Sequence, residues 1–233
     1  MYTYGPTYLN KEQSMTNRLK FLTISGLALM LAAVSLVMGQ AGTNAALRTP
    51  TNEMAPATFK VNFDTTAGAF IVDVRRDWSP NGVDRFYNMV KNGYFTDVRF
   101  YRVSPNFMVQ FGIHGDPAVT SAWAKAPIKD DPVKQSNARG NLTFAKTGLP
   151  NSRTTQLFIN FKDNDFLDAQ GFSPIGRVTT GMNVVDKLYS GYGEMAEQGG
   201  KGPSQGQFTA QGNAYVAKDF SKLDYIKKAT IEK

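Results

Sequence analysis

Short segments in which apolar and polar side chains alternate constrain this chain more than any other feature. In residues 58–64 three apolar side chains alternate with polar ones, and the alternation resumes after a turn at residues 65–68. A period of two is typical of a strand with one buried face, so these segments predict a β-hairpin. Similar short runs, separated by Gly, Pro and Asn, lie at residues 98–103, 107–111, 141–145, 156–160, 173–178 and 225–231.

Only two helices are expected between these runs. Ser79 and Pro80 are typical of a helix N-terminus, and Gly93 ends the apolar face that follows them. A second helix is predicted at residues 180–189. Many short strands with two helices favour a closed barrel capped by the helices, because closure removes exposed sheet edges, and a β-sandwich is the alternative. Residues 190–213 contain seven glycines and predict a long irregular loop.

The N-terminal region has the features of an export signal. Residues 21–39 carry no charge, and three basic residues between positions 11 and 20 precede them. Positive charge before an apolar run keeps that end in the cytoplasm and sends the following chain across the membrane. The segment is either cleaved, after Gly39 or Ala45, or retained as an anchor, since ~20 apolar residues suffice to span a bilayer.

These features divide the chain into three parts. Residues 1–45 are expected to form a signal peptide or N-terminal membrane anchor, residues 46–57 a linker, and residues 58–233 the folded domain, with Met15 as an alternative start to Met1. The domain is expected to be a monomer in the periplasm or secreted. Attachment to the inner membrane, facing the periplasm, is the alternative.

Composition excludes several kinds of site. The chain has no cysteine, which rules out thiolate nucleophiles, disulfides and zinc sites of the cysteine type. Its net charge of +7 is spread without a Lys/Arg block, so nucleic-acid binding is not expected. The single histidine, His114, has no visible partner for a triad or a metal site, and the glycine-rich loop lacks a preceding strand and a following helix. No metal or cofactor is therefore expected.

A long insertion at residues 118–136 separates the strand-like runs at residues 107–111 and 141–145, and it has no assigned role. It contains Trp123. Within it, Asp130 and Asp131 precede a proline and predict a solvated turn.

Residues 100–110 (FYRVSPNFMVQ) resemble a known family. They are similar to the FHRVIPGFMIQGGD signature of cyclophilins, whose end is echoed by Gly115 and Asp116. Further blocks follow in the family's order at residues 144–148, 155–159, 166–168, 175–178 and 181–182. The resemblance covers about residues 58–231. It implies a mainly β fold, a closed eight-stranded antiparallel barrel capped by two α-helices, and peptidyl-prolyl cis-trans isomerase activity on proline-containing polypeptides.

The resemblance also implies roles for individual residues. Arg102 would donate to the prolyl nitrogen and Gln110 would hold a substrate carbonyl, which makes these two the implied catalytic residues. The implied substrate-binding residues are Tyr101, Phe107, Met108, Ala145, Lys146, Thr147, Gln156, Phe158, Phe166, Leu167 and Phe172. Taken alone, Met108 and Phe158 are more typical of a barrel core, and Arg102 fits a surface ion pair equally well. Only their joint placement favours a site.

Several positions depart from the family's pattern. Tyr101 stands where many members have histidine, and Lys146 and Thr147 replace an Asn-Ala pair. Phe166 replaces a frequent tryptophan, and Phe172 lies near another usual histidine. We therefore expect a shifted peptide preference, and weaker cyclosporin binding because the indole donor is missing. The alternative functions are a non-catalytic proline-peptide-binding or chaperone module on the same barrel, and a membrane-anchored scaffold.

Overall fold

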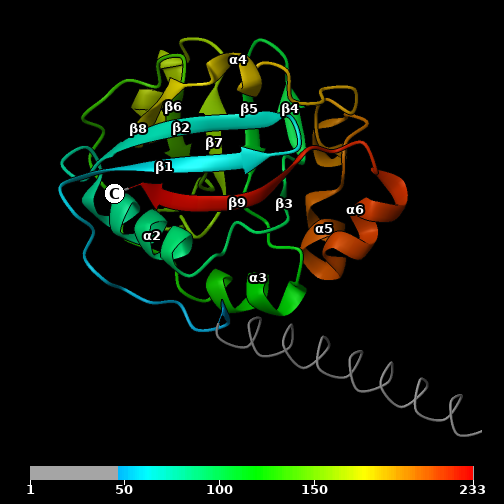
Figure 1. Cartoon of the computed structure of the whole chain (residues 1–233), viewed down its shortest axis with the longest axis horizontal. Coiled ribbons are helices and arrows are strands. Elements are labelled where there is room, and N and C mark those ends of the chain that lie inside the picture. Colours follow the sequence, from blue (N-terminus) through cyan, green and yellow to red (C-terminus); the bar gives the residue numbers. More distant parts are fainter. Residues whose placement is uncertain (1–46, 233) are drawn as a thin grey trace, which may run out of the picture. The chain divides into compact units, whose positions relative to one another are not determined.

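The computed structural model describes residues 47–232, so the predicted signal or anchor at residues 1–45 lies outside the described part of the chain (Figure 1). Among the described residues, no helix combines the length and the apolar character needed to cross a bilayer. The strands are β1 (Thr58–Thr65), β2 (Gly68–Arg75), β3 (Val98–Arg99), β4 (Arg102–Ser104), β5 (Met108–Phe111), β6 (Asn141–Phe144), β7 (Leu157–Asn160), β8 (Pro174–Thr180) and β9 (Tyr225–Glu232).

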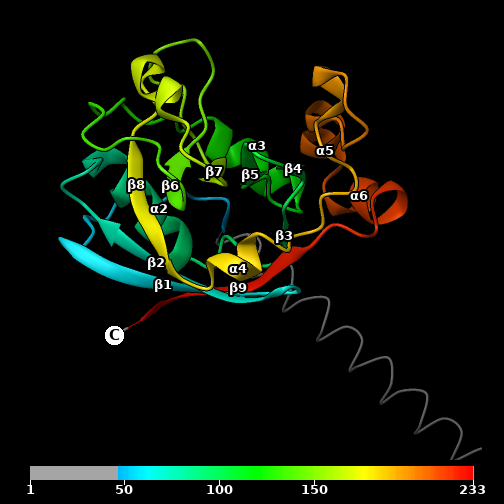
Figure 2. The same cartoon turned by 90° about the horizontal axis from the view of Figure 1, so that it is seen from above.

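All nine strands belong to one antiparallel sheet in the order β3-β9-β1-β2-β8-β6-β7-β5-β4. Figures 1 and 2 show this sheet curling around an interior, with β1, β2 and β9 on one side and β5, β6 and β7 on the other. The two ends of the order, β3 and β4, are separated only by Phe100 and Tyr101. If β3 and β4 are counted as one interrupted strand, the sheet has eight strands. That strand pairs with β9 through its first part and with β5 through its second part. The predicted mainly β fold and the hairpin of β1 and β2 are confirmed.

The helices differ more from the prediction. They are α2 (Pro80–Lys91), α3 (Pro117–Ala124), α4 (Met182–Val185), α5 (Gln205–Gln211) and α6 (Asn213–Asp219), with 3-10 turns η1 (Asp165–Gln170) and η2 (Ala196–Gln198). The first predicted helix is confirmed as α2. The second, expected over residues 180–189, shrinks to the single turn of α4, because the backbone beyond Asp186 forms bonds of 3-10 type, such as Leu188 N to Val185 O. Residues 190–213, expected as an irregular loop, contain η2 and α5.

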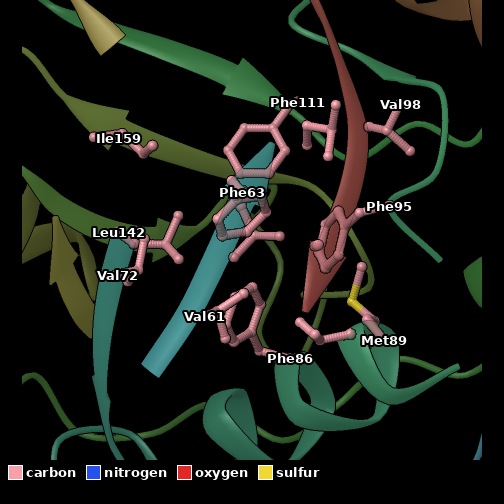
Figure 3. Close-up of a cluster of buried hydrophobic side chains, with 14 of the residues drawn as sticks. Val61, Phe63, Val72, Phe86, Met89, Phe95, Val98, Phe111, Leu142 and Ile159 are labelled. Carbon is pink, nitrogen blue, oxygen red and sulfur yellow. The ribbon is translucent and has the colours of Figure 1, made fainter. Parts of the chain in front are cut away.

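Aromatic side chains fill the interior of the curled sheet (Figure 3). Phe63 stacks on Phe70 with ring centroids 4.9 Å apart and meets Phe95 and Phe111 edge-on at 5.7 and 6.2 Å. Phe86 reaches the same cluster from α2, so this helix covers one end of the interior. Such aromatic pairs add about 0.5–1.5 kcal/mol each beyond the burial of their area. The core thus fixes the strands whose outer face carries the site.

The N-terminus of α2 is capped by a residue from the long insertion. The carboxylate of Asp131 accepts hydrogen bonds from Ser79 Oγ at 2.6 Å, from the Gly82 amide at 2.9 Å and from Arg153 Nη2 at 2.9 Å. The predicted solvated turn is therefore wrong at Asp131, which is buried because it closes the positive end of the helix. Burial raises the pKa of Asp131, but the three donors outweigh it and hold this pKa below its usual range.

The chain from residue 47 to residue 57, predicted as part of the linker, lies along α2. The Glu53 amide donates to Asn88 Oδ1 at 3.0 Å and the Ala55 amide to an oxygen of Asp84 at 2.9 Å. At its start, the carbonyl of Leu47 accepts a 2.6 Å hydrogen bond from the indole of Trp123, which is fully buried beside α2. The insertion therefore contacts the start of the described chain through the Trp123–Leu47 hydrogen bond.

Candidate active site

The outer face of strands β4, β5 and β7 carries a row of functional side chains. Because side chains alternate along a strand, Val109 of β5 enters the core while Met108 and Gln110 face outward. The strand register places Arg102 opposite Gln110, and Gln110 opposite Phe158. Directly opposed residues in an antiparallel pair have Cβ atoms ~5 Å apart, so a cation, an amide and an aromatic ring lie side by side.

An open cavity of about 540 Å³ lies over this row. All but one of the predicted site residues line it, namely Arg102, Phe107, Met108, Gln110, Ala145, Lys146, Thr147, Gln156, Phe158, Phe166, Leu167 and Phe172. The structure thus brings together residues that are up to 70 positions apart in the sequence (172 minus 102). Ser152, Thr154, Gln170, Met195, Gln198 and Gln205 also line the cavity and were not predicted.

Tyr101 is the exception and corrects the prediction that it contacts substrate. Its ring is completely buried in a second core cluster and meets Phe208 of α5 edge-on at 5.8 Å. Only its hydroxyl approaches the site, where it donates a 2.5 Å hydrogen bond to Gln156 Oε1. Burial raises the pKa of Tyr101, so this hydroxyl keeps its proton. Tyr101 therefore holds the side chain of Gln156 through this hydrogen bond and does not itself line the cavity.

The apolar half of the cavity is a pocket with an aromatic floor. Met108, Phe158 and Leu167 form a buried cluster, on which Phe107 and Phe172 pack. Phe172 meets Phe158 edge-on with centroids 5.8 Å apart. Flat apolar walls of this kind fit a small saturated ring, and their burial supplies a hydrophobic contribution to binding.

The turn η1 holds the far wall of this pocket. Asp168 Oδ1 accepts hydrogen bonds from the amide of Asn137 at 2.9 Å and from its Nδ2 at 2.7 Å. The same Nδ2 group donates to the carbonyl of Phe172 at 2.8 Å. Burial raises the pKa of Asp168, but hydrogen bonds from Ser136 and Asn137 leave it below its usual range. This anchoring fixes Leu167 and Phe172 against the strands.

Two aromatic residues and a lysine form the rim. Phe166 is 53% exposed and stacks on Phe107 with centroids 6.0 Å apart. On the other side, Lys146 Nζ donates to the carbonyl of Gln170 at 3.2 Å and lies 5.9 Å from the centre of the Phe172 ring. The rim thus combines an exposed apolar surface with one cation.

The polar half of the cavity is a chain of hydrogen bonds. Arg102 Nη1 donates to Gln110 Oε1 at 3.0 Å, and Gln110 Nε2 donates to Gln156 Oε1 at 3.0 Å. The guanidinium carbon of Arg102 lies 5.6 Å from the centre of the Phe107 ring, a cation–π contact that shields the charge from water. The order of donors and acceptors leaves the second Nε2 hydrogen of Gln110 without a partner among these residues.

Glu194 pairs with Arg102 and was missed by sequence reasoning. Its carboxylate accepts from Arg102 Nε at 3.0 Å and from Nη2 at 2.8 Å. We call residues 190–205 the wall segment, because Met195, Gln198 and Gln205 from it line one side of the cavity. No block of the family resemblance fell in this segment, and its glycine content pointed to a loop, so no local signal marked Glu194.

These groups are suited to bind a peptide and to stabilise charge on it by electrostatic interactions. The cavity offers an apolar pocket, two amide side chains and a guanidinium, which is a planar group with five N–H donors. Among residues 47–232, no group of three or more His, Cys, Asp and Glu side chains is placed to hold a metal ion. The arrangement can hold an extended chain and stabilise charge that develops beside the apolar pocket.

Comparison with known proteins gives a consistent result. The family model described as cyclophilin type peptidyl-prolyl cis-trans isomerase/CLD matches residues 59–210. A peptidyl-prolyl cis-trans isomerase of Acinetobacter baylyi is 37% identical over 139 residues, which cover 58% of this chain and 73% of that protein. Peptidyl-prolyl cis-trans isomerase B of Escherichia coli is 36% identical over 136 residues, covering 55% of this chain and 82% of its own.

Solved structures share the fold. A cyclophilin of Cryptosporidium parvum superposes with a TM-score of 0.54 at 17% identity, covering 76% of this chain and 98% of that one. A cyclophilin of Hirschia baltica gives a TM-score of 0.51 at 18% identity, with coverage of 76% and 75%. Because the family model spans most of the described domain and the cavity lies where the matched blocks converge, the chain belongs to the cyclophilin-type peptidyl-prolyl cis-trans isomerase family.

Proposed function

We propose that this isomerase acts on Xaa-Pro bonds of polypeptides outside the cytoplasm, through a site centred on Arg102 and Gln110. One observation carries the assignment of the site: the register of β4, β5 and β7 sets Arg102 and Gln110 in one row with Phe158, at the edge of an apolar pocket. A prolyl ring in that pocket would bring its nitrogen toward the guanidinium.

The chemistry needs no acid, base or nucleophile. Rotation about a peptide bond faces a barrier of about 18–20 kcal/mol, because the nitrogen lone pair is delocalised into the carbonyl. When the bond twists, the lone pair localises on nitrogen and becomes a hydrogen-bond acceptor. A donor held beside that nitrogen therefore binds the twisted form more strongly than either planar form, which lowers the barrier.

Arg102 has donors to spare for this role. A guanidinium carries five N–H groups. Glu194 accepts from Nε and Nη2 and Gln110 accepts from Nη1, which leaves one N–H on each terminal nitrogen. The free Nε2 hydrogen of Gln110 is suited to donate to a substrate carbonyl.

The experiment is exchange NMR on a short peptide with one Xaa-Pro bond, with the purified protein added at catalytic concentration. We expect line broadening from accelerated cis/trans exchange. The Arg102→Ala variant should lose about 100-fold in kcat/KM, the usual cost of removing one transition-state donor. Arg177→Ala, which removes an exposed arginine from β8, is the matched control.

One outcome would count against the enzyme, and another against the role of Arg102. Peptide binding without faster exchange would favour the alternative of a non-catalytic peptide-binding or chaperone module. Unchanged turnover in the Arg102→Ala variant would remove Arg102 from the mechanism.

The location outside the cytoplasm rests on the uncharged segment at residues 21–39 and the basic residues before it. Fractionation of cells that express the full chain tests it. We expect the protein in the periplasmic fraction, with a new N-terminus after Gly39 or Ala45 if the signal is cleaved, or in the inner-membrane fraction if it is retained. We further propose that the exported isomerase assists the folding of exported proteins. Recovery in the cytosol with an intact N-terminus would contradict export and this role with it.

A further inference from the structure

We propose that Glu194 is a positioning residue, which holds the Arg102 guanidinium in the orientation needed for catalysis. The inference rests on the proposed role of Arg102 and adds a residue from the wall segment to it. Figures 1 and 2 show the orange part of the chain that leads into α5 standing beside β4, the strand that carries Arg102.

The first step of the argument is the geometry of the pair. Both oxygens of Glu194 lie 3.0 Å from Arg102 Nε, and Oε2 lies 2.8 Å from Nη2. The carboxylate therefore grips one edge of the planar guanidinium and fixes the plane as well as the position. The Arg102 side chain is 11% exposed and that of Glu194 is 30% exposed, so the pair is shielded far better than a surface ion pair.

The second step is that the wall segment holds Glu194 rigidly. The carbonyl of Glu194 accepts a 2.7 Å hydrogen bond from the Gly202 amide, and the neighbouring Met195 is buried in the second core cluster. A Cβ atom at Gly200 would lie 2.1 Å from the Glu194 carbonyl oxygen, so only glycine permits this close approach.

A second carboxylate locks the far end of the segment. Glu197 Oε1 accepts from Ser204 Oγ at 2.7 Å and from the Gly206 amide at 3.2 Å. These contacts lower the pKa of Glu197 to about 2. The Glu197 carboxylate thus forms its hydrogen bonds with Ser204 and Gly206, at the end of the wall segment, whereas the Glu194 carboxylate binds Arg102.

The third step separates positioning from blocking. Glu194 occupies the Nε–Nη2 edge of the guanidinium, and Gln110 accepts one hydrogen from Nη1, which leaves one hydrogen on each terminal nitrogen. Arg102 still lines the open cavity with Glu194 in place. A carboxylate that sequestered the arginine would close this access, so the arrangement favours support over inhibition.

The consequence is a specific kinetic pattern. A freed arginine keeps its charge and its reach, so it still attracts substrate in the ground state. Its alignment with the prolyl nitrogen matters only as the bond twists, and a misplacement of ~1 Å can cost 100-fold in rate. Loss of Glu194 should therefore lower kcat and leave KM nearly constant.

The test compares Glu194→Ala and Glu194→Gln with the wild-type protein. We expect kcat to fall about 10- to 100-fold in Glu194→Ala, with KM within about twofold, and an intermediate loss in Glu194→Gln, which retains a neutral acceptor. Glu232→Ala, which removes an exposed glutamate at the end of β9, is the control.

An NMR readout distinguishes positioning from general loss of structure. In 15N-labelled protein, the Nε–H signal of Arg102 should be slow to exchange with water in the wild type and fast in Glu194→Ala, while backbone amide signals of β5 and β7 stay in place. Unchanged or increased kcat in Glu194→Ala, in an active wild-type background, would overturn the positioning role alone. An inactive wild-type protein would overturn the proposed function itself.

Discussion

Arg102 and Gln110 lie directly opposite each other in the register of β4 and β5, and Arg102 Nη1 donates to Gln110 Oε1 at 3.0 Å. With Glu194 on its other edge, the guanidinium is held from two sides by acceptors of different charge. The shape of this cation is therefore as important as its charge. A basic residue without this planar shape should therefore not replace Arg102.

Arg102→Lys should be nearly as inactive as Arg102→Ala. A lysine ammonium is a compact charge without a planar fork, so it cannot donate to Glu194 on one edge and to Gln110 on another. We expect a loss of roughly 100-fold in kcat/KM, measured by exchange NMR on a prolyl peptide. Arg177→Lys on β8 controls for the change in side chain. Activity within about threefold of wild type in Arg102→Lys would show that charge alone suffices.

Phe166→Trp should bind cyclosporin A more tightly than the wild-type protein. The resemblance to cyclophilins implies an indole donor at this position, and Phe166 cannot supply one. Its ring is 53% exposed and stacks on Phe107, so the larger indole can be accommodated at the rim. One regained hydrogen bond contributes about 0.5–1.5 kcal/mol, which predicts roughly a threefold to tenfold lower Kd by calorimetry.

Phe166→Leu, which also lacks a donor, is the control for a change of packing at the rim. Equal affinities of the tryptophan variant and the wild-type protein would place the cause of any weak binding elsewhere, for example at Lys146 or Thr147.

The sequence predicts the strand pattern from local periodicity, and the resemblance to cyclophilins predicts the centre of the site. The period of two that marks β5 also determines that Met108 and Gln110 share a face while Val109 does not. Ordered blocks of resemblance then locate the same face on β4 and β7. Such local signals are sufficient to predict which face of a strand a side chain occupies, because that depends only on its position along the strand.

Long-range contacts are what the sequence could not reveal. Arg102 and Glu194 are 92 positions apart, and the cap that Asp131 forms at Ser79 spans 52 positions. Nothing adjacent to Glu194 or Asp131 in the sequence identifies these partners. Tyr101 was misplaced for the same reason, because the ring that covers it, Phe208, comes from a segment expected to be a loop.

The wall segment should affect long peptides more than short ones. Gln198 and Gln205 line the same cavity as Arg102, and their amide groups can pair with the backbone of an extended substrate. We expect the Gln198→Ala/Gln205→Ala double variant to raise KM about threefold to tenfold for a peptide of ten residues, and to leave a tetrapeptide unaffected. Steady-state kinetics on both peptides provide the measurement.

The matched control replaces Gln207 and Gln211, two exposed glutamines of α5 that do not line the cavity. Equal KM values for the long peptide in both double variants would show that the wall does not contact substrate.

Asp131 should contribute more to stability than any exposed carboxylate of the domain. Its removal leaves the Arg153 guanidinium, which is 1% exposed, without its closest ion-pair partner, while Asp130 remains 3.5 Å from Arg153 Nε. Breaking a buried pair on one side costs about 3–5 kcal/mol, and we expect that loss in the free energy of unfolding of Asp131→Ala by urea denaturation at pH 7. Asp219→Ala, at an exposed position in α6, should lose less than about 0.5 kcal/mol.

The same carboxylate gives stability a defined pH dependence. The pKa of Asp131 in the folded protein lies below its value in the unfolded chain, which is about 3.9. Its contribution is therefore complete above the unfolded pKa and is lost as the pH falls through the folded pKa. As the pH falls from about 5 to about 2, the wild-type protein should lose stability more steeply than Asp131→Asn, whose side chain does not titrate. Parallel curves for the two proteins would mean that the pKa of Asp131 is the same in the folded and the unfolded state, which would remove the electrostatic basis of the helix cap.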